Sequence, residues 1–167
     1  MEEYFPIINI DGEVIGKATR KECHSGAMLL HPVVHLHIFR PGGYIYLQKR
    51  SLNKDIQPGK WDTAVGGHVD YGESIETALH REAGEELGLK DINPDKLVRY
   101  IFQSEIEQEM VNVYYINVGD DFAPSFDPIE IDDARFWYFD EINEVIGKGI
   151  LTPNFEKEYI RIRNLIK

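Results

Sequence analysis

The sequence predicts an α/β sandwich built on a mixed β-sheet. Three observations support this fold class. Short β-branched or alternating segments separated by turn residues fill much of the chain, and one clear amphipathic helix interrupts them. The strands and helices do not follow the regular βαβ rhythm of a doubly wound fold. A length of 167 residues without repeats or low-complexity stretches predicts one domain over residues 1–167.

Turn residues separate the strands expected in the first half of the chain. Asp11-Gly12 is a strong hairpin signal, and Pro41-Gly42-Gly43 marks a second turn. The segment HPVVHLHIF between these turns is β-branched and alternating. Strands are therefore expected at residues 4–10, 14–18, 31–39, 44–48 and 61–65, with a polar loop at 51–60.

The second half opens with the clearest helix of the chain, over residues 74–87. Ser74 is its expected N-cap and Gly88 its C-terminal stop. Leu79, Ala83 and Leu87 form an apolar stripe that should pack on the sheet. Three further strands are expected at residues 97–103, 110–118 and 134–138, and two helices at 140–146 and 152–165, the last opened by Thr152-Pro153.

Composition limits the functions open to this chain. The 29 acidic residues outnumber the 18 Lys and Arg residues, which gives a net charge of −11. Such a chain is a poor candidate for a nucleic-acid polymer, and a small anionic substrate would need a bound cation. The single cysteine, Cys23, fits a reducing compartment. The acidic N-terminus resembles no signal peptide and no apolar run could span a membrane, so the expected location is the cytoplasm.

Three carboxylates on the helix point to chemistry. Glu82, Glu85 and Glu86 have i, i+3, i+4 spacing, which places them on one stripe, where they repel one another. Mg²⁺ prefers such oxygen ligands and would remove the repulsion. Arg81 is spaced to orient Glu85 through a charge-assisted hydrogen bond. Taken alone, E-x-x-E-E is more often a solvated helix face.

The surrounding residues change this interpretation. Seven positions in and around the helix carry the residue that one known motif requires there. A chance match to all seven anywhere in the chain is on the order of one in a million. The seven are Gly67, Glu73, Arg81, Glu82, Glu85, Glu86 and Gly88. Residues 67–89 therefore resemble the Nudix box.

The Nudix resemblance implies an α/β/α sandwich that hydrolyses a diphosphate linked to another group. It implies Mg²⁺, with Mn²⁺ as a second choice, held by Glu82, Glu85, Glu86 and the Gly66 carbonyl. It also implies that Glu73 braces the loop or the helix through Arg81. The expected partner is a small-molecule diphosphate compound, and a monomer and a homodimer both stay open.

Segments outside the box resemble the isopentenyl-diphosphate isomerase-like branch of the same family. They are Asp11-Gly12, Gly16, Arg20, His24, QKRS at residues 48–51 and PGKWDTAVGGH at residues 58–68. The resemblance implies a second metal site, for which imidazole and carboxylate ligands suit Mn²⁺ or Zn²⁺. Its candidate ligands are His24, His31, His68, Glu107 and Glu109. His35 and His37 are expected to be structural, and His80 solvated.

One departure from the isomerases favours hydrolysis. The isomerases carry a catalytic cysteine directly before the box Gly-His, and here that position is Gly66. The box is also whole, whereas it tends to be degenerate in the isomerases. The preferred hypothesis is a Mg²⁺-dependent Nudix hydrolase that cleaves a nucleoside di- or triphosphate derivative or a related diphosphate compound. The alternatives are an isomerase and a binding module that has lost catalysis.

Other side chains are candidates for the rim of the site. Arg50 and Lys60, or Lys54, could meet the substrate's phosphates, and surface solubility explains them equally well. Glu105, Glu107 and Glu109 are candidates for the general base, with Glu109 preferred. Five aromatic residues could stack a base, although most large aromatics belong to the core: Tyr44, Trp61, Phe102, Tyr114 and Trp137.

The negative charge is concentrated in two places. Residues 67–90 hold six acids and two bases, and residues 105–133 hold nine acids and no base. These are the box and the segment that supplies the candidate glutamates. We therefore expect a divalent metal to be required before a phosphate-bearing partner can bind.

Overall fold

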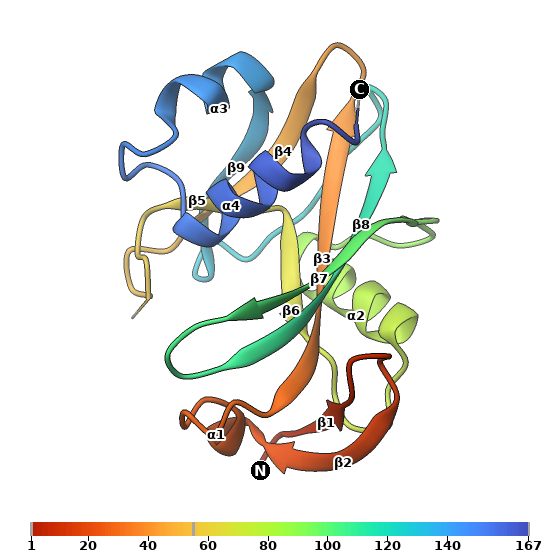
Figure 1. The fold of residues 1–167 in the computed structure, drawn as a ribbon. Helices are drawn as coiled ribbons and strands as arrows, with labels where there is room; N and C mark the ends of the chain where they lie inside the picture. The colour runs from red at the N-terminus through yellow and green to blue at the C-terminus, as the bar shows by residue number, and fades with distance from the viewer. Residues whose placement is uncertain (1, 55, 167) are drawn as a thin grey trace.

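The structure is a computed structural model that describes residues 2–54 and 56–166. A mixed β-sheet with helices on both of its faces occupies most of the chain (Figure 1). The strands are β1 (Tyr4–Ile8), β2 (Val14–Thr19), β3 (Leu30–Arg40), β4 (Tyr44–Arg50), β5 (Trp61–Thr63), β6 (Val65–His68), β7 (Asp95–Gln103), β8 (Gln108–Asn117) and β9 (Ile131–Tyr138). The helices are α1 (Arg20–Cys23), α2 (Ile75–Leu87), α3 (Phe139–Val145) and α4 (Pro153–Ile162).

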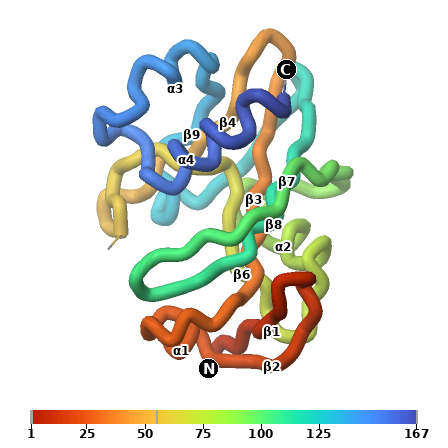
Figure 2. Tube along the Cα trace, in the orientation of Figure 1, coloured from red at the N-terminus to blue at the C-terminus, as the bar shows by residue number. Residues whose placement is uncertain are grey.

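The long strand β3 organises the sheet. One of its edges pairs in parallel with β8, which in turn pairs with β7. Its other edge is shared, because β6 pairs with the first half of β3 and β4 pairs with its last residues. Strands β5 and β9 flank β4, and β1 and β2 form a separate hairpin close to the start of β3 (Figure 2). The short β6 therefore leads directly from the sheet into α2.

Alternating residues of β3 separate the two layers of core. Val34, Leu36 and Ile38 pack in a cluster with α2, whereas Phe39 packs in a second cluster with α3 and α4. Alternation of this kind is what a strand covered on both faces requires. The expected α/β/α sandwich is confirmed, with α2 on one face and α3 and α4 on the other (Figure 1).

The caps of the predicted helices account for their positions. The Ser74 hydroxyl accepts a hydrogen bond from the Thr77 amide at 3.1 Å, and Gly88 ends α2 with a left-handed φ of 64°. Thr152 caps α4 in the same way. This helix ends at Ile162 rather than at residue 165, where it was expected to end. None of the helices in the described part of the chain is long and apolar enough to cross a membrane.

Two local predictions were wrong. The short helix α1 was not expected, although Thr19 and Glu22 form a capping box that starts it. The single strand expected at residues 61–65 is divided into β5 and β6, which pair with different partners, β4 and β3. The division lies at Ala64, and β6 extends through Gly66-Gly67 to His68.

Gly84 offers a test of the helix that is independent of the site. A Cβ on Gly84 would meet only ordinary contacts, the nearest being the Leu89 carbonyl oxygen at 3.7 Å. We expect Gly84→Ala to raise the free energy of unfolding by about 1 kcal/mol, measured by urea denaturation, because glycine costs about that much inside a helix. Gly88→Ala is the contrasting variant. It should lower stability, since Gly88 has positive φ and a Cβ there would lie 3.2 Å from the Ser125 carbonyl oxygen.

Candidate active site

A cavity of about 620 Å³ lies where β6, the second half of α2, the β7–β8 hairpin and the start of α4 meet. Its wall is dominated by carboxylates, which come from four segments that are distant in the sequence. The acidic lining residues are Asp62, Glu82, Glu85, Glu86, Glu107, Glu109, Asp127 and Glu130. The cationic lining residues are Arg20, Arg50 and Lys54. The charge that the sequence concentrates in two segments is thus gathered around one cavity.

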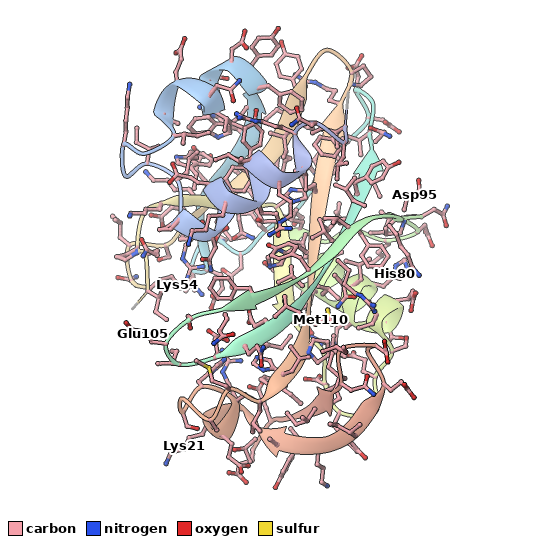
Figure 3. The ribbon with its side chains drawn as sticks, in the orientation of Figure 1. Lys21, Lys54, His80, Asp95, Glu105 and Met110 are labelled. Carbon is pink, nitrogen blue, oxygen red and sulfur yellow. The ribbon has the colours of Figure 1, made fainter. Side chains whose placement is uncertain are left out.

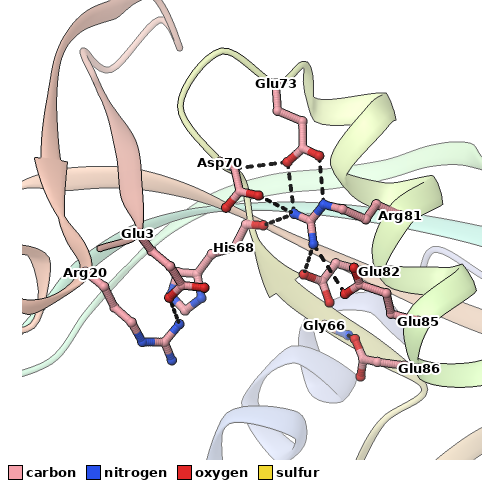
Figure 4. A network of polar contacts seen from close by, with 10 residues as sticks. All are labelled: Glu3, Arg20, Gly66, His68, Asp70, Glu73, Arg81, Glu82, Glu85 and Glu86. Carbon is pink, nitrogen blue, oxygen red and sulfur yellow. Dashed lines mark hydrogen bonds and ion pairs between the residues drawn. The ribbon is translucent and has the colours of Figure 1, made fainter. Parts of the chain in front are cut away.

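Arg81 ties the loop after β6 to the helix that carries the carboxylates (Figure 4). Its guanidinium donates two hydrogen bonds to Glu73, at 2.8 and 2.9 Å, and one to the His68 carbonyl oxygen at 3.1 Å. It also donates to Glu82 at 2.8 Å, whereas the expected partner Glu85 lies at 3.5 Å and is well exposed. Arg81 therefore fixes Glu73 and Glu82 more firmly than Glu85.

Glu82 and Glu86 lie against the two glycines of β6. A Cβ on Gly67 would lie only 2.2 Å from the carboxylate carbon of Glu82, so this position accepts only glycine without displacing that side chain. The Gly66 amide donates to Glu86 at 3.3 Å. Gln48 donates to the other oxygen of Glu86 at 2.9 Å. Gln48 belongs to the QKRS segment at residues 48–51, and the sequence analysis expected no role for it.

The electrostatics of this pair fit a hard cation. Burial raises the pKa of Glu86 to about 8, and the nearby charge of Glu82 adds to the effect. Burial also raises the pKa of Glu82 above its usual value. Ionised carboxylates that are partly buried without a cationic partner cost free energy. A divalent cation that prefers oxygen ligands would remove that cost. Glu82, Glu85, Glu86 and the Gly66 carbonyl are therefore the candidates to hold a divalent cation.

These raised pKa values predict how stability depends on pH in metal-free protein. Between the ordinary value of 4.5 and about 8, folded Glu86 keeps a proton that the unfolded chain has lost. Stability must then fall as pH rises through that window. Denaturation in EDTA should show lower stability at pH 8 than at pH 5, added Mg²⁺ should restore it, and Glu86→Gln should flatten the dependence. A metal-free stability that rises over this window would contradict the assignment.

A second cluster of metal-ligating side chains lies beside the first. One ligand atom from each of His24, His31, His68 and Glu107 lies within 4.8 Å of the other three. Nε2 of His24 lies 3.2 Å from Glu107, and Nε2 of His31 lies 3.7 Å from it. Glu109 is close as well, with its carboxylate 3.7 Å from His68 Nε2 and 3.8 Å from His31 Nε2. The chain thus brings together all five residues that the isomerase resemblance implies.

Three polar atoms of this cluster are buried and lie near one another, but none forms a hydrogen bond of good geometry with the described residues. They are Nε2 of His31, Nε2 of His68 and Oε1 of Glu107. The other ring nitrogen of His31 lies 2.9 Å from the Leu29 carbonyl oxygen, which leaves Nε2 as the free ligand atom. Burial lowers the pKa of His68 to about 3, so its imidazole is neutral. Neutral imidazole and carboxylate facing one another form a donor set suited to Mn²⁺ or Zn²⁺.

The structure places the remaining candidates differently. Arg50 and Lys54 line the cavity, and among the described lining residues Lys60 is absent. Exposed Glu105 lies at the tip of the β7–β8 hairpin, outside the cavity wall (Figure 3). His80 is exposed on α2, as expected (Figure 3).

The five aromatic candidates for stacking a base do not line the described cavity wall. Trp61 and Trp137 pack edge to face at 5.2 Å, and Tyr114 belongs to the core cluster under α2. Phe102 packs against a cluster of valines, and Tyr44 packs on Tyr138 at 5.2 Å. The stacking role is therefore not supported, because these rings serve the packing of the sheet.

Comparisons with known proteins show which sequences and structures this chain is similar to. The sequence profile of the NUDIX domain matches residues 29–155. An isopentenyl-diphosphate Delta-isomerase of Leifsonia xyli is 35% identical over 151 residues, which cover 86% of this chain and 79% of that protein. An uncharacterized Nudix hydrolase of a Nostoc species is 31% identical, over 88% of this chain and 87% of its own. A crystal structure from Deinococcus radiodurans superposes with a TM-score of 0.79 at 25% identity, covering 96% of this chain and 99% of its own.

Proposed function

Because the chain belongs to the Nudix hydrolase family, in a branch similar to the isopentenyl-diphosphate isomerases, we propose that it is a Mg²⁺-dependent hydrolase of a small diphosphate compound. The substrate class is a nucleoside di- or triphosphate derivative or a related diphosphate. One observation carries the proposal. The complete set of box carboxylates, with the Gly66-Gly67 segment against them, forms a wall of a cavity large enough for such a compound.

In this proposal the carboxylates bind the metal and the cationic side chains attract the substrate. Bound Mg²⁺ would neutralise phosphate charge and acidify a water molecule. Glu82, Glu85 and Glu86, with the Gly66 carbonyl, hold the cation, and Glu73 and Arg81 position Glu82. The cations Arg50, Lys54 and Arg20 lie at the cavity wall, where they can attract the phosphates of the substrate. Arg50 and Lys54 are the candidate phosphate ligands, because the described cavity wall includes both of them and not Lys60.

Glu109 is the candidate general base. A base must accept the proton of the attacking water, and its pKa should lie near the working pH. Burial raises the pKa of Glu109 to about 7, and the charge of Glu107 adds to the effect. Glu109 also lines the cavity, unlike Glu105. These two properties support Glu109 over the other candidates.

The cluster of His24, His31, His68, Glu107 and Glu109 is proposed as a second metal site, and Glu109 can act as the general base only when it is not a ligand of that site. Its test does not depend on activity. Mn²⁺ binding, followed by electron paramagnetic resonance, should show tight sites that His31→Gln weakens by more than about 10-fold. His80→Gln, which changes an exposed histidine of α2, is the matched control and should bind like the wild type. Equal binding by both variants would remove the histidines from the ligand set.

A panel of diphosphate compounds with Mg²⁺ and Mn²⁺ tests the activity. The products should show which bond breaks, and chelation should stop turnover. If no compound turns over and metal leaves the thermal midpoint unchanged, the chain is a binding module rather than a hydrolase. The intact carboxylate set argues against that outcome.

An isomerase is the second candidate, and the His–Glu cluster and the isomerase relative both favour it. The position before the box Gly-His, where the isomerases carry cysteine, is Gly66. The single cysteine cannot substitute, because Cys23 is fully buried and burial raises the pKa of its thiol to about 11. Incubation with isopentenyl diphosphate in deuterated water decides between the two. Deuterium exchange into the isoprenyl group would favour the isomerase, and its absence the hydrolase.

A further inference from the structure

A buried carboxylate of α4 lies beneath the cavity. Glu158 is 1% exposed and is hydrogen-bonded to three side chains from two other strands. Its oxygens lie 2.8 Å from Nδ1 of His35, 2.6 Å from Nε2 of His37 and 2.5 Å from the Tyr100 hydroxyl. Both histidines were expected to be structural, and no role was expected for Glu158 or Tyr100.

These contacts make Glu158 an ionised acceptor. Burial opposes its ionisation, but the charge of His35 and the hydrogen bonds from His35 and His37 outweigh burial and hold its pKa well below the usual value. A buried charge is tolerated only when it is paired and fully hydrogen-bonded. Both histidines therefore donate to the carboxylate, and the imidazole of His35 is fixed through Nδ1.

The two histidines differ in what their other edge faces. His37 is fully buried beside Phe39 and Phe155. The side chain of His35 is 23% exposed and lines the cavity. It is paired in register with Gly66, and a Cβ on Gly66 would lie 3.6 Å from Nε2 of His35. Among the described residues, no side chain or backbone group forms a hydrogen bond with that Nε2.

His35 keeps one ring nitrogen, Nε2, that its partner Glu158 does not occupy, and its side chain lines the cavity. The other lining cations have acidic partners: Arg20 pairs with Glu3, Arg50 with Asp62 and Lys54 with Glu130. The pairing of His35 with Glu158 occupies only Nδ1. A ring held between the Glu158 carboxylate at Nδ1 and a substrate phosphate at Nε2 would donate a hydrogen bond from both nitrogens.

We propose that His35 is a further substrate-contacting residue, whose Nε2–H donates to a phosphate oxygen of the diphosphate substrate. Glu158 is then a positioning residue, which fixes the ring through Nδ1 from α4. The inference rests on the proposed diphosphatase function and adds a specific phosphate ligand to it. His35 would contribute this contact from the part of the cavity wall where β3 pairs with β6.

The experiment compares His35→Gln with His37→Gln. Both variants remove one hydrogen bond to Glu158, but only His35 lines the cavity. Affinity for inorganic diphosphate, in the presence of Mg²⁺, is measured by titration calorimetry. We expect His35→Gln to weaken binding by about 10- to 100-fold, the usual value of a hydrogen bond to a charged group. His37→Gln should change affinity less than about 3-fold, while lowering the thermal midpoint.

Glu158→Gln tests positioning. It should raise the KM for the best substrate of the panel more than it lowers kcat, because the imidazole remains present but is less well fixed. A change in thermal midpoint with KM and kcat unaltered would reduce Glu158 to a structural role and overturn the positioning claim.

A measurement on the wild-type protein avoids dependence on the folding of any variant. With ¹⁵N-labelled histidine, Mg²⁺ and inorganic diphosphate should shift the Nε2 resonance of His35 relative to Mg²⁺ alone, and should leave that of His37 in place. If diphosphate binds but His35 is unmoved, or if both glutamine variants bind equally, the proposal is overturned while the hydrolase stands. If the wild type neither binds nor hydrolyses any diphosphate, the proposed function itself fails.

Discussion

Glu86→Gln should reduce metal-dependent hydrolysis by more than about 100-fold, because even outer-shell partners of a metal site are worth about 10- to 100-fold. The substitution keeps the size of the side chain and removes a carboxylate whose pKa burial raises to about 8. At pH 7 the metal-free variant should be at least as stable as the wild type, because folding of the wild type has to protonate Glu86 and folding of the variant does not. Steady-state rates across the diphosphate panel and Mg²⁺ titrations followed by calorimetry measure the two effects.

Glu144→Gln is the matched control for this variant. It removes the same charge from an exposed residue of α3, remote from the cavity wall. Its turnover and Mg²⁺ affinity should equal those of the wild type. Undiminished turnover in Glu86→Gln would exclude Glu86 as a metal ligand, and a fall in both variants would point to net charge rather than coordination.

Gly67→Ala should lower metal-dependent turnover by about 100-fold while leaving the fold intact. The new Cβ would lie 2.2 Å from the carboxylate carbon of Glu82, so this carboxylate has to move. A displacement of about 1 Å in a catalytic group can cost about 100-fold in rate. The change in stability should be small, because the atoms that must give way are the flexible end of one side chain. Turnover, Mg²⁺ affinity and urea denaturation are the measurements.

Gly84→Ala, in the helix that carries Glu82, provides the comparison. Its Cβ meets no atom closer than 3.7 Å, so turnover should stay at the wild-type level while stability rises. If Gly67→Ala retains wild-type turnover, Glu82 does not need its present position. If it unfolds instead, the contact belongs to the core rather than to the metal site, and the assignment of Glu82 loses its support.

Much of the fold could be predicted because its signals are local. Ser74 and Gly88 bound α2, Thr152-Pro153 starts α4, and Asp11-Gly12 turns the first hairpin. Caps and turns depend on residues a few positions apart, so the sequence displays them directly. The division of residues 61–68 between β5 and β6 was not predicted, because pairing partners are chosen by tertiary contacts.

The candidate site divides in the same way. The box carboxylates share one helix, so their spacing identifies them as a group without any knowledge of the tertiary fold. The lysine assigned to the substrate depended on which loop side chains reach the cavity, and there Lys54 rather than Lys60 lies on the wall. The aromatic candidates failed for a related reason, since a ring's sequence position does not tell whether it packs in the core.

By itself, the sequence determined the α/β class and the helix that carries the box carboxylates, and it predicted the need for a divalent cation, because periodicity, caps and repeated carboxylates are short-range properties. Only the tertiary structure decided which charges meet. It joined Glu158 of α4 to His35 of β3, 123 residues apart, and turned a histidine expected to be structural toward the cavity. Contacts of that range follow from the packing of a helix on a sheet, and local sequence carries no record of them.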